Sequence, residues 1–192
     1  MKPIILIGGG GHCKSVIDVI ELEGKYKIAG IIDKPVMVGK SILGYKVIGS
    51  DDDLVDLFKK YKYALITIGQ IKSAKLRIKM YKKVKFLGFS LPIIISPNAY
   101  VSTHSSIEEG TVIMHNALVN SNVKIGINCI INSKALIEHD CNIGDNCHLS
   151  TGSITNGNVI IGNGSFIGSN AVTKHDIKIL ENSFINAGSV VK

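Results

Sequence analysis

His139 lies between two acidic residues in the run Glu138-His139-Asp140. A carboxylate beside an imidazole orients the ring and raises its basicity, as a general base near neutral pH requires. His148 follows nine residues later. His139 and Asp140 are therefore candidates for proton transfer. Three other histidines carry no further support and are assigned to the surface: His104, His115 and His175.

A six-residue period surrounds these candidates. From Val101 to Val191, every sixth residue is aliphatic in fourteen of sixteen cases. The residue two places earlier is nearly always small, and the residue three places earlier is Asn, Asp or Gly in fourteen of sixteen cases. Such a period fits neither a helix nor plain alternation, but it fits a short strand followed by a corner. The aliphatic column is expected to point inward, and the Asn, Asp or Gly column to take left-handed corner angles.

Three strands and three corners make a coil of 18 residues, so residues 18 apart should stack at about 4.8 Å. Residues 98–192 then give about five coils. The repeat predicts a left-handed parallel β-helix over residues 93–192.

This coil geometry places the candidate base. His139 is two places past the inward-pointing Ile137, and Asp140 is in the corner column, so both should face outward. Gly157 is 18 residues after His139 and should stack over it. We expect its missing side chain to leave room for a ligand and its N–H to face a developing oxyanion. Half a coil separates His139 from His148, which predicts different faces of one subunit.

The first half reads as alternating strands and helices. The apolar run 4–7 is followed by Gly8-Gly9-Gly10-Gly11-His12 and then by a helix over 15–23. A glycine-rich turn at a helix start lets backbone N–H groups approach a phosphate. Cys13 stands where the dinucleotide fingerprint has its third glycine, so an NAD enzyme is not predicted. We predict a small Rossmann-like domain over 1–92, with further strands at 28–32, 47–48 and 64–68 and helices at 51–59 and 73–83.

Four segments together carry a family resemblance over the whole chain: Gly-Gly-Gly-Gly-His-Cys-Lys, Ile31-Ile32-Asp33, Ile66-Thr67-Ile68-Gly69, and Ser96-Pro97 before the repeat. The chain resembles the sialic-acid and amino-sugar acetyltransferases, which include the bacillosamine-pathway enzyme and fall within the hexapeptide-repeat acyltransferases. Members are trimers that bind acetyl-CoA between neighbouring β-helices and a nucleotide sugar in the N-terminal domain. The resemblance thus implies a nucleotide-sugar-binding domain over 1–92 and an acetyl-CoA-binding β-helix over 93–192.

The resemblance also implies roles for individual residues. His139 would be the base and Asp140 its orienting carboxylate. From the half-coil separation of the two histidines we infer, in addition, that one site combines His139 and His148 from adjacent subunits of a homotrimer. Acetyl-CoA would contact His148, Gly157, Ser169 and Ala187, and the acceptor would contact Gly10, Gly11, His12, Asp33 and Gly69.

The charge of the chain is uneven. The net charge is +9 over residues 1–92 and −2 over residues 93–192. The basic half either attracts an anionic small molecule such as a nucleotide or is a solvated face. No aromatic-rich basic platform accompanies it, so a nucleic-acid partner is not predicted. No apolar run approaches the ~18 residues of a membrane span, and the start does not resemble a signal peptide. We expect a cytoplasmic protein without a membrane partner.

The cysteine spacing matches no zinc or redox motif. Three cysteines fall in the small-residue column of the repeat, where a buried filler is expected: Cys129, Cys141 and Cys147. Neither a metal nor a disulfide is therefore predicted.

The favoured function is an acetyl-CoA-dependent N-acetyltransferase acting on the 4-amino group of a UDP-linked 4-amino-4,6-dideoxy sugar, a precursor for surface glycans or protein glycosylation. A sialic-acid (nonulosonic acid) O-acetyltransferase and an N-acetyltransferase of GDP-perosamine type remain open. The segment Gly188–Lys192 ends the sequence without the Gly-Val-Pro-Ala-Lys-like tail of the resembled family. A non-catalytic nucleotide-sugar-binding partner is therefore a further alternative.

Overall fold

The computed structural model describes residues 1–192, which form two compact units. The first unit comprises Met1–Gly69 and Lys75–Pro92, and the second comprises Gln70–Ala74 and Ile93–Lys192. The short segment Gln70–Ala74 therefore packs with the second unit although both of its neighbours in sequence belong to the first. No helix is long and apolar enough to span a membrane.

The first unit is a five-stranded sheet with helices, which confirms the Rossmann-like α/β expectation. Its strand order is β3-β4-β2-β1-β5, and all pairs are parallel except the β3–β4 hairpin. Strand β1, which has a neighbour on each side, ends in the buried apolar run Ile4–Ile7 because interior parallel strands are covered on both faces. The elements are β1 Lys2–Ile7, α1 Gly11–Glu23, β2 Tyr26–Ile32, η1 Pro35–Met37, β3 Ser41–Ile42, β4 Tyr45–Gly49, η2 Asp51–Asp53, α2 Leu54–Phe58, β5 Tyr63–Ile66 and α3 Lys75–Phe86.

Two details of this unit differ from the sequence prediction. Helix α1 begins at Gly11 rather than at residue 15, because Gly10 is the N-cap and the glycine turn is correspondingly short. The hairpin of β3 and β4 was not expected. Its turn uses positive φ at Leu43 (46°) and Gly44 (84°), the backbone angles that suit a two-residue hairpin turn.

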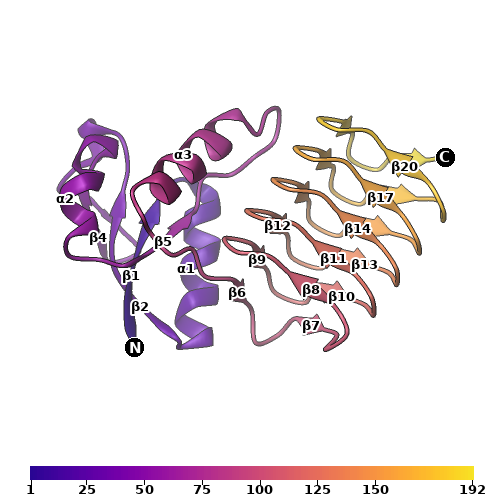
Figure 1. Cartoon of the computed structure of the whole chain (residues 1–192), viewed down its shortest axis with the longest axis horizontal. Helices are drawn as coiled ribbons and strands as arrows, with labels where there is room; N and C mark the ends of the chain where they lie inside the picture. The colour runs from indigo at the N-terminus through magenta and orange to yellow at the C-terminus, as the bar shows by residue number, and fades with distance from the viewer. The chain divides into compact units, whose positions relative to one another are not determined.

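The second unit is a left-handed parallel β-helix, as the repeat predicts (Figure 1). Neighbouring strands on each face are parallel and 18 residues apart, as in the pair Leu118 and Leu136. Face 1 consists of β6 Ile94–Ile95, β9 Val112–Ile113, β12 Ile130–Ile131, β15 His148–Leu149, β18 Phe166–Ile167 and β21 Phe184–Ile185. Face 2 consists of β7 Tyr100–Val101, β10 Leu118–Val119, β13 Leu136–Ile137, β16 Ile154–Thr155, β19 Val172–Thr173 and β22 Val190–Val191. Face 3 consists of β8 Ser106–Ile107, β11 Lys124–Ile125, β14 Asn142–Ile143, β17 Ile160–Ile161 and β20 Lys178–Ile179.

The corner column takes the predicted left-handed backbone. Every sixth residue from Gly110 to Gly188 has positive φ. Even Lys134, whose type does not favour this region, has a φ of 60° because the coil closes only with that geometry. The aliphatic column and the three cysteines of the repeat form the buried core, which confirms the filler role of Cys129, Cys141 and Cys147.

Candidate functional site

The candidate base lies at the corner between face 2 and face 3. His139 follows strand β13 and is exposed. Its Nδ1 is 2.7 Å from Oδ2 of Asp140. Because a carboxylate only accepts, the neutral ring carries its proton on Nδ1 and leaves Nε2 as the basic nitrogen. The two residues that the sequence placed in one function are thus joined by a hydrogen bond.

The corner backbone positions the carboxylate of this pair. Asp140 has a φ of 63°, which turns the chain directly after His139. The other carboxylate oxygen, Oδ1, accepts a hydrogen bond of 2.7 Å from Nδ2 of Asn122, one coil away. Asn122 was not singled out from the sequence, although its place in the corner column 18 residues before Asp140 is a signal that could have identified it.

Electrostatics favour a basic imidazole and an ionised carboxylate. The hydrogen bond with Asp140 raises the pKa of His139 above its ordinary value, and the charges of Asp140, Glu138 and Asp176 act in the same direction. The hydrogen bond from Asn122 lowers the pKa of Asp140, and the bond to His139 lowers it further. Near neutral pH the pair can therefore take up one proton at Nε2 while the carboxylate stays charged.

Gly157 lies over His139, as the coil arithmetic predicts. A Cβ at residue 157 would come 2.8 Å from Cε1 and 2.9 Å from Nε2 of the imidazole. The room left by the missing side chain is therefore filled by the His139 ring itself rather than left open for a ligand. The backbone N–H of Gly157 makes no hydrogen bond within the chain and can donate to a bound group.

His148 lies on face 1 in β15 and is buried, so the structure places His139 and His148 on different faces of the subunit. Its Nε2 lies 3.2 Å from Nδ2 of Asn132. The amide orientation of Asn132 is fixed because its Oδ1 accepts from the N–H of Ser133 at 2.8 Å. Nδ2 of Asn132 is therefore the donor, and the proton of the neutral His148 ring is assigned to Nδ1.

That Nδ1 proton is donated to the backbone carbonyl of Gln70. The Gln70 side chain is buried, and its Nε2 donates to the carbonyl of Asn146 at 2.9 Å. The Phe166 ring makes a T-shaped contact with the imidazole, with ring centroids 5.2 Å apart. His148 is thus held from three sides in one tautomer. Sequence reasoning missed Gln70 and Asn132, because the contact with Gln70 joins residues 78 apart.

Ser169 and Ala187 lie at the corner between face 1 and face 2, one coil apart. Ser169 is half-buried, with its Oγ 3.0 Å from Oγ of Ser150, and Ala187 is exposed. Within one subunit, this corner and the His139 corner flank face 2 without meeting. The structure therefore does not bring Ser169 and Ala187 together with His139 in a single chain.

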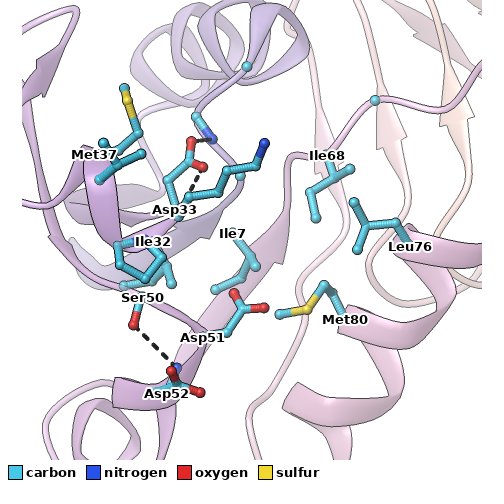
Figure 2. Close-up of a pocket in the computed structure, with 17 residues that line it drawn as sticks. Ile7, Ile32, Asp33, Met37, Ser50, Asp51, Asp52, Ile68, Leu76 and Met80 are labelled. Carbon is cyan, nitrogen blue, oxygen red and sulfur yellow. Dashed lines mark hydrogen bonds between the residues drawn. The ribbon is translucent and has the colours of Figure 1, made fainter.

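The five acceptor candidates belong to the first unit, where a cavity of about 870 Å³ opens at the carboxyl ends of the strands (Figure 2). Strand β1 is paired with β2 on one side and β5 on the other, and ligands of parallel sheets bind beyond such a point. Gly10, Asp33 and Gly69 line this cavity. Figure 2 shows Leu76 and Met80 of α3 forming an apolar side of it.

The glycine turn of this cavity is tied to Asp33. Oδ2 of Asp33 accepts from the N–H of Gly9 at 2.8 Å, and Oδ1 accepts from the N–H of Lys34 at 2.7 Å. A Cβ at residue 9 would meet Cδ1 of Ile42 and come 2.7 Å from Oδ2 of Asp33, so a side chain there would displace both. Gly10 and Gly11 have open space where a Cβ would be, at the start of the thirteen-residue helix α1. The turn therefore leaves that helix start accessible to an anionic group.

His12 and Arg77 lie beside the chain that follows β5. A Cβ at Gly69 would be 3.5 Å from Cβ of His12, which is half-buried. Arg77 is 1% exposed, and its Nη1 donates to the carbonyls of Ile66 and Ile68, each at 2.8 Å. Arg77 thus fixes the backbone before Gly69. In the sequence, Arg77 is only one of the basic residues of the first half.

Two other kinds of chemistry have little support. Burial raises the pKa of Cys13 to about 11, so this thiol stays protonated near neutral pH. No group of three or more His, Cys, Asp or Glu side chains is arranged to hold a metal ion.

A left-handed β-helix built from six-residue repeats is the architecture of the hexapeptide-repeat acyltransferases. Comparison with family models agrees. Residues 3–84 match the PglD N-terminal domain, and residues 158–192 match the bacterial transferase hexapeptide (six repeats). A comparison with curated protein sequences found no significant match.

Solved structures match over the whole chain. Perosamine N-acetyltransferase from Caulobacter crescentus, as a mutant in complex with CoA and GDP-perosamine, is 32% identical with a TM-score of 0.94, covering 100% of this chain and 89% of that one. The acetyltransferase domain of PglB from Neisseria gonorrhoeae FA1090 is 27% identical with a TM-score of 0.92, covering 100% and 92%. This chain belongs to the amino-sugar N-acetyltransferase family and is an acetyl-CoA-dependent enzyme.

Proposed function

We propose that this enzyme transfers the acetyl group of acetyl-CoA to the 4-amino group of a nucleotide-linked 4-amino-4,6-dideoxy sugar, with His139 as general base. The observation that carries the proposal is the 2.7 Å contact between Nδ1 of His139 and Oδ2 of Asp140. It leaves Nε2 as the acceptor, on an exposed ring whose pKa is raised by that hydrogen bond.

In the proposed reaction, the sugar amine attacks the thioester carbonyl carbon and forms the new C–N bond. Nε2 of His139 takes the proton that the nitrogen loses, and Asp140 stabilises the resulting imidazolium. The N–H of Gly157 donates to the carbonyl oxygen as negative charge develops there. The C–S bond then breaks, and the CoA thiolate recovers a proton.

The acetyl-CoA contacts are proposed from the second unit. His148, held as a neutral ring, would present a fixed surface to the thioester or pantetheine arm. Ser169 and Ala187 would offer coil backbone to CoA. Gly157 would contribute its N–H, which the chain itself leaves without a hydrogen bond.

The acceptor is proposed to bind in the cavity of the first unit. Its diphosphate would lie at Gly10 and Gly11, where the helix start is open, with His12 and Gly69 beside it. The nucleobase would lie toward Asp33. UDP is the favoured nucleotide, because the resemblance to the bacillosamine-pathway enzyme implies it.

A GDP-linked acceptor is the second candidate. The Caulobacter crescentus perosamine N-acetyltransferase was crystallised with GDP-perosamine and is 32% identical over the whole chain, against 27% for the PglB domain. Both candidates share the reaction and differ in the base and the sugar.

Thiol release from acetyl-CoA tests the proposal, with a UDP-linked 4-amino-4,6-dideoxy sugar, GDP-perosamine and sialic acid assayed side by side. Release with the UDP sugar alone supports the favoured acceptor, and release with GDP-perosamine alone supports the second candidate. Release with sialic acid alone, or with none of the three, contradicts N-acetylation of a 4-amino sugar. A His139→Ala variant that keeps near-full turnover removes His139 from the mechanism.

We further propose a homotrimer whose subunits meet along face 2. The outward residues of face 3 are largely polar, whereas those of face 2 are all apolar or aromatic, and its two ends, Tyr100 and Val190, are more than 60% exposed. A trimer would also let the corner that carries His139 meet the Ser169 corner of a neighbour. The face 2 column consists of Tyr100, Leu118, Leu136, Ile154, Val172 and Val190.

A further inference from the structure

We propose that Asn122 is a positioning residue for the base, acting on His139 through Asp140. The inference rests on the proposed function, because it assigns Asn122 to the orientation of the proposed general base.

The three side chains form one hydrogen-bonded chain. Nδ2 of Asn122 donates to Oδ1 of Asp140 at 2.7 Å, while Oδ2 of Asp140 bonds Nδ1 of His139 at 2.7 Å. Each carboxylate oxygen therefore has its own partner. A carboxylate bonded through only one oxygen is free to rotate, whereas this one cannot rotate without losing a bond. Asn122 thus fixes the plane in which Asp140 meets the imidazole.

The charged groups facing His139 are Asp140 and Glu138 on its own coil and Asp176 further along the stack. The hydrogen bond that His139 donates to Asp140 raises the pKa of the imidazole more than any neighbouring charge does. Asn122 is neutral and adds no charge to this set. Its influence on His139 must therefore pass through the orientation and ionisation of Asp140.

The same corner carries a second Asn–Asp pair that serves as an internal control. Nδ2 of Asn158 donates to Oδ1 of Asp176 at 2.8 Å, with the same spacing of 18 residues. The corner angles match, with φ of 58° at Asn122 and 57° at Asn158. Asp176 also follows a histidine, His175, but no hydrogen bond joins them. The Asn122–Asp140 pair is therefore bonded to a histidine, whereas the Asn158–Asp176 pair is not.

Glycine is the appropriate replacement at both positions, because Gly152 and Gly164 occupy the same corner column at positive φ. Asn122→Gly and Asn158→Gly then remove one amide each with matched effects on the backbone. The pKa of His139 is measured directly by NMR titration of the imidazole in each variant. We expect Asn122→Gly to lower it by about 0.5, because a freely rotating Asp140 bonds the ring for less of the time. Asn158→Gly should leave it unchanged.

A double-variant comparison tests the route through Asp140. The single variant Asn122→Gly should lower kcat about threefold to tenfold with little change in KM. In an Asp140→Gly background, adding Asn122→Gly should change neither the pKa of His139 nor kcat. No shift with Asn122→Gly, an equal shift with Asn158→Gly, or a full further effect in the double variant would overturn the proposal. The titration needs no turnover. A His139→Ala variant that keeps near-full turnover would therefore refute the proposed base without deciding whether Asn122 orients Asp140.

Discussion

Gly157 is stacked over His139 so closely that a Cβ at residue 157 would lie 2.8 Å from the imidazole. Because residue 157 has no side chain, the imidazole of His139 can lie directly against its backbone. Replacement by alanine must move the ring or the corner, because real Cβ contacts are longer than this distance.

We therefore expect Gly157→Ala to lower kcat about tenfold or more while the β-helix stays folded, because misplacing a base by a fraction of an ångström weakens proton transfer. Steady-state kinetics and circular dichroism measure the two effects. Ser121→Ala, in the same column one coil before His139, is the control and should be close to wild type. Full activity of Gly157→Ala would show that the ring position seen here is not the catalytic one.

Asp140→Asn tests the electrostatics of the base. The base acts in its neutral form, and its pKa is raised by the bond to Asp140, so kcat/KM should fall as the pH drops through a value above the ordinary 6.5 of histidine. Without the carboxylate charge, this acidic limb should move to lower pH and kcat should fall about tenfold or more. The pH profile of kcat/KM measures it. An unmoved limb would mean that another group titrates.

Gln70→Ala tests the support of His148. The variant loses the hydrogen bond to the Asn146 carbonyl and opens a cavity at a side chain that is 2% exposed. We expect a loss of about 2 kcal/mol in unfolding free energy and a severalfold higher KM for acetyl-CoA. Thermal unfolding and kinetics measure these. Ile71→Ala changes an exposed neighbour and should alter neither the unfolding free energy nor the KM for acetyl-CoA. Equal effects of the two variants would contradict a specific role for Gln70.

Asp33→Ala tests the acceptor cavity. It removes the acceptor for the N–H groups of Gly9 and Lys34, so the glycine turn loses its tie to the end of β2. The KM for the nucleotide sugar should rise about tenfold, with little change in the KM for acetyl-CoA. Asp56→Ala removes an exposed carboxylate in the same unit and is the matched control. A rise confined to the KM for acetyl-CoA would mean that the nucleotide sugar binds elsewhere.

Leu118→Glu tests the proposed trimer. Leu118 is an outward residue of face 2 on the coil before His139, so a buried charge there should prevent association and abolish transfer. Analytical ultracentrifugation and the acetyl-transfer assay measure the outcome. Ile160→Glu makes the same change on face 3, where the residue is 43% exposed, and should leave the assembly intact. Trimers formed by Leu118→Glu would exclude face 2 as the interface.

The β-helix could be predicted from the sequence because each coil position repeats the same surroundings. The inward aliphatic column and the corner column keep their meaning through sixteen periods, so Lys134 takes its neighbours' geometry despite its type. Periodicity also placed Gly157 over His139 and separated the faces of His139 and His148.

Features that depend on single contacts were not predictable in this way. The β3 hairpin depends on Leu43 taking positive φ, which its residue type does not indicate. Gln70 reaches His148 across 78 residues of sequence, and Arg77 fixes the chain before Gly69 through carbonyls that no motif names. Such contacts follow from tertiary packing, which a sequence pattern of short period does not describe.

The 18-residue pairing of Leu118 with Leu136 also limits how this gene can change in length. Adding or deleting a whole coil keeps every later residue on its own face, so the stack can grow or shorten in that step. A change of six residues keeps the inward column intact but turns everything after it by one face. If it fell between His139 and His148, the fold would survive while the two histidines lost their relationship. Insertions and deletions that preserve the site should therefore come in whole coils of 18 residues.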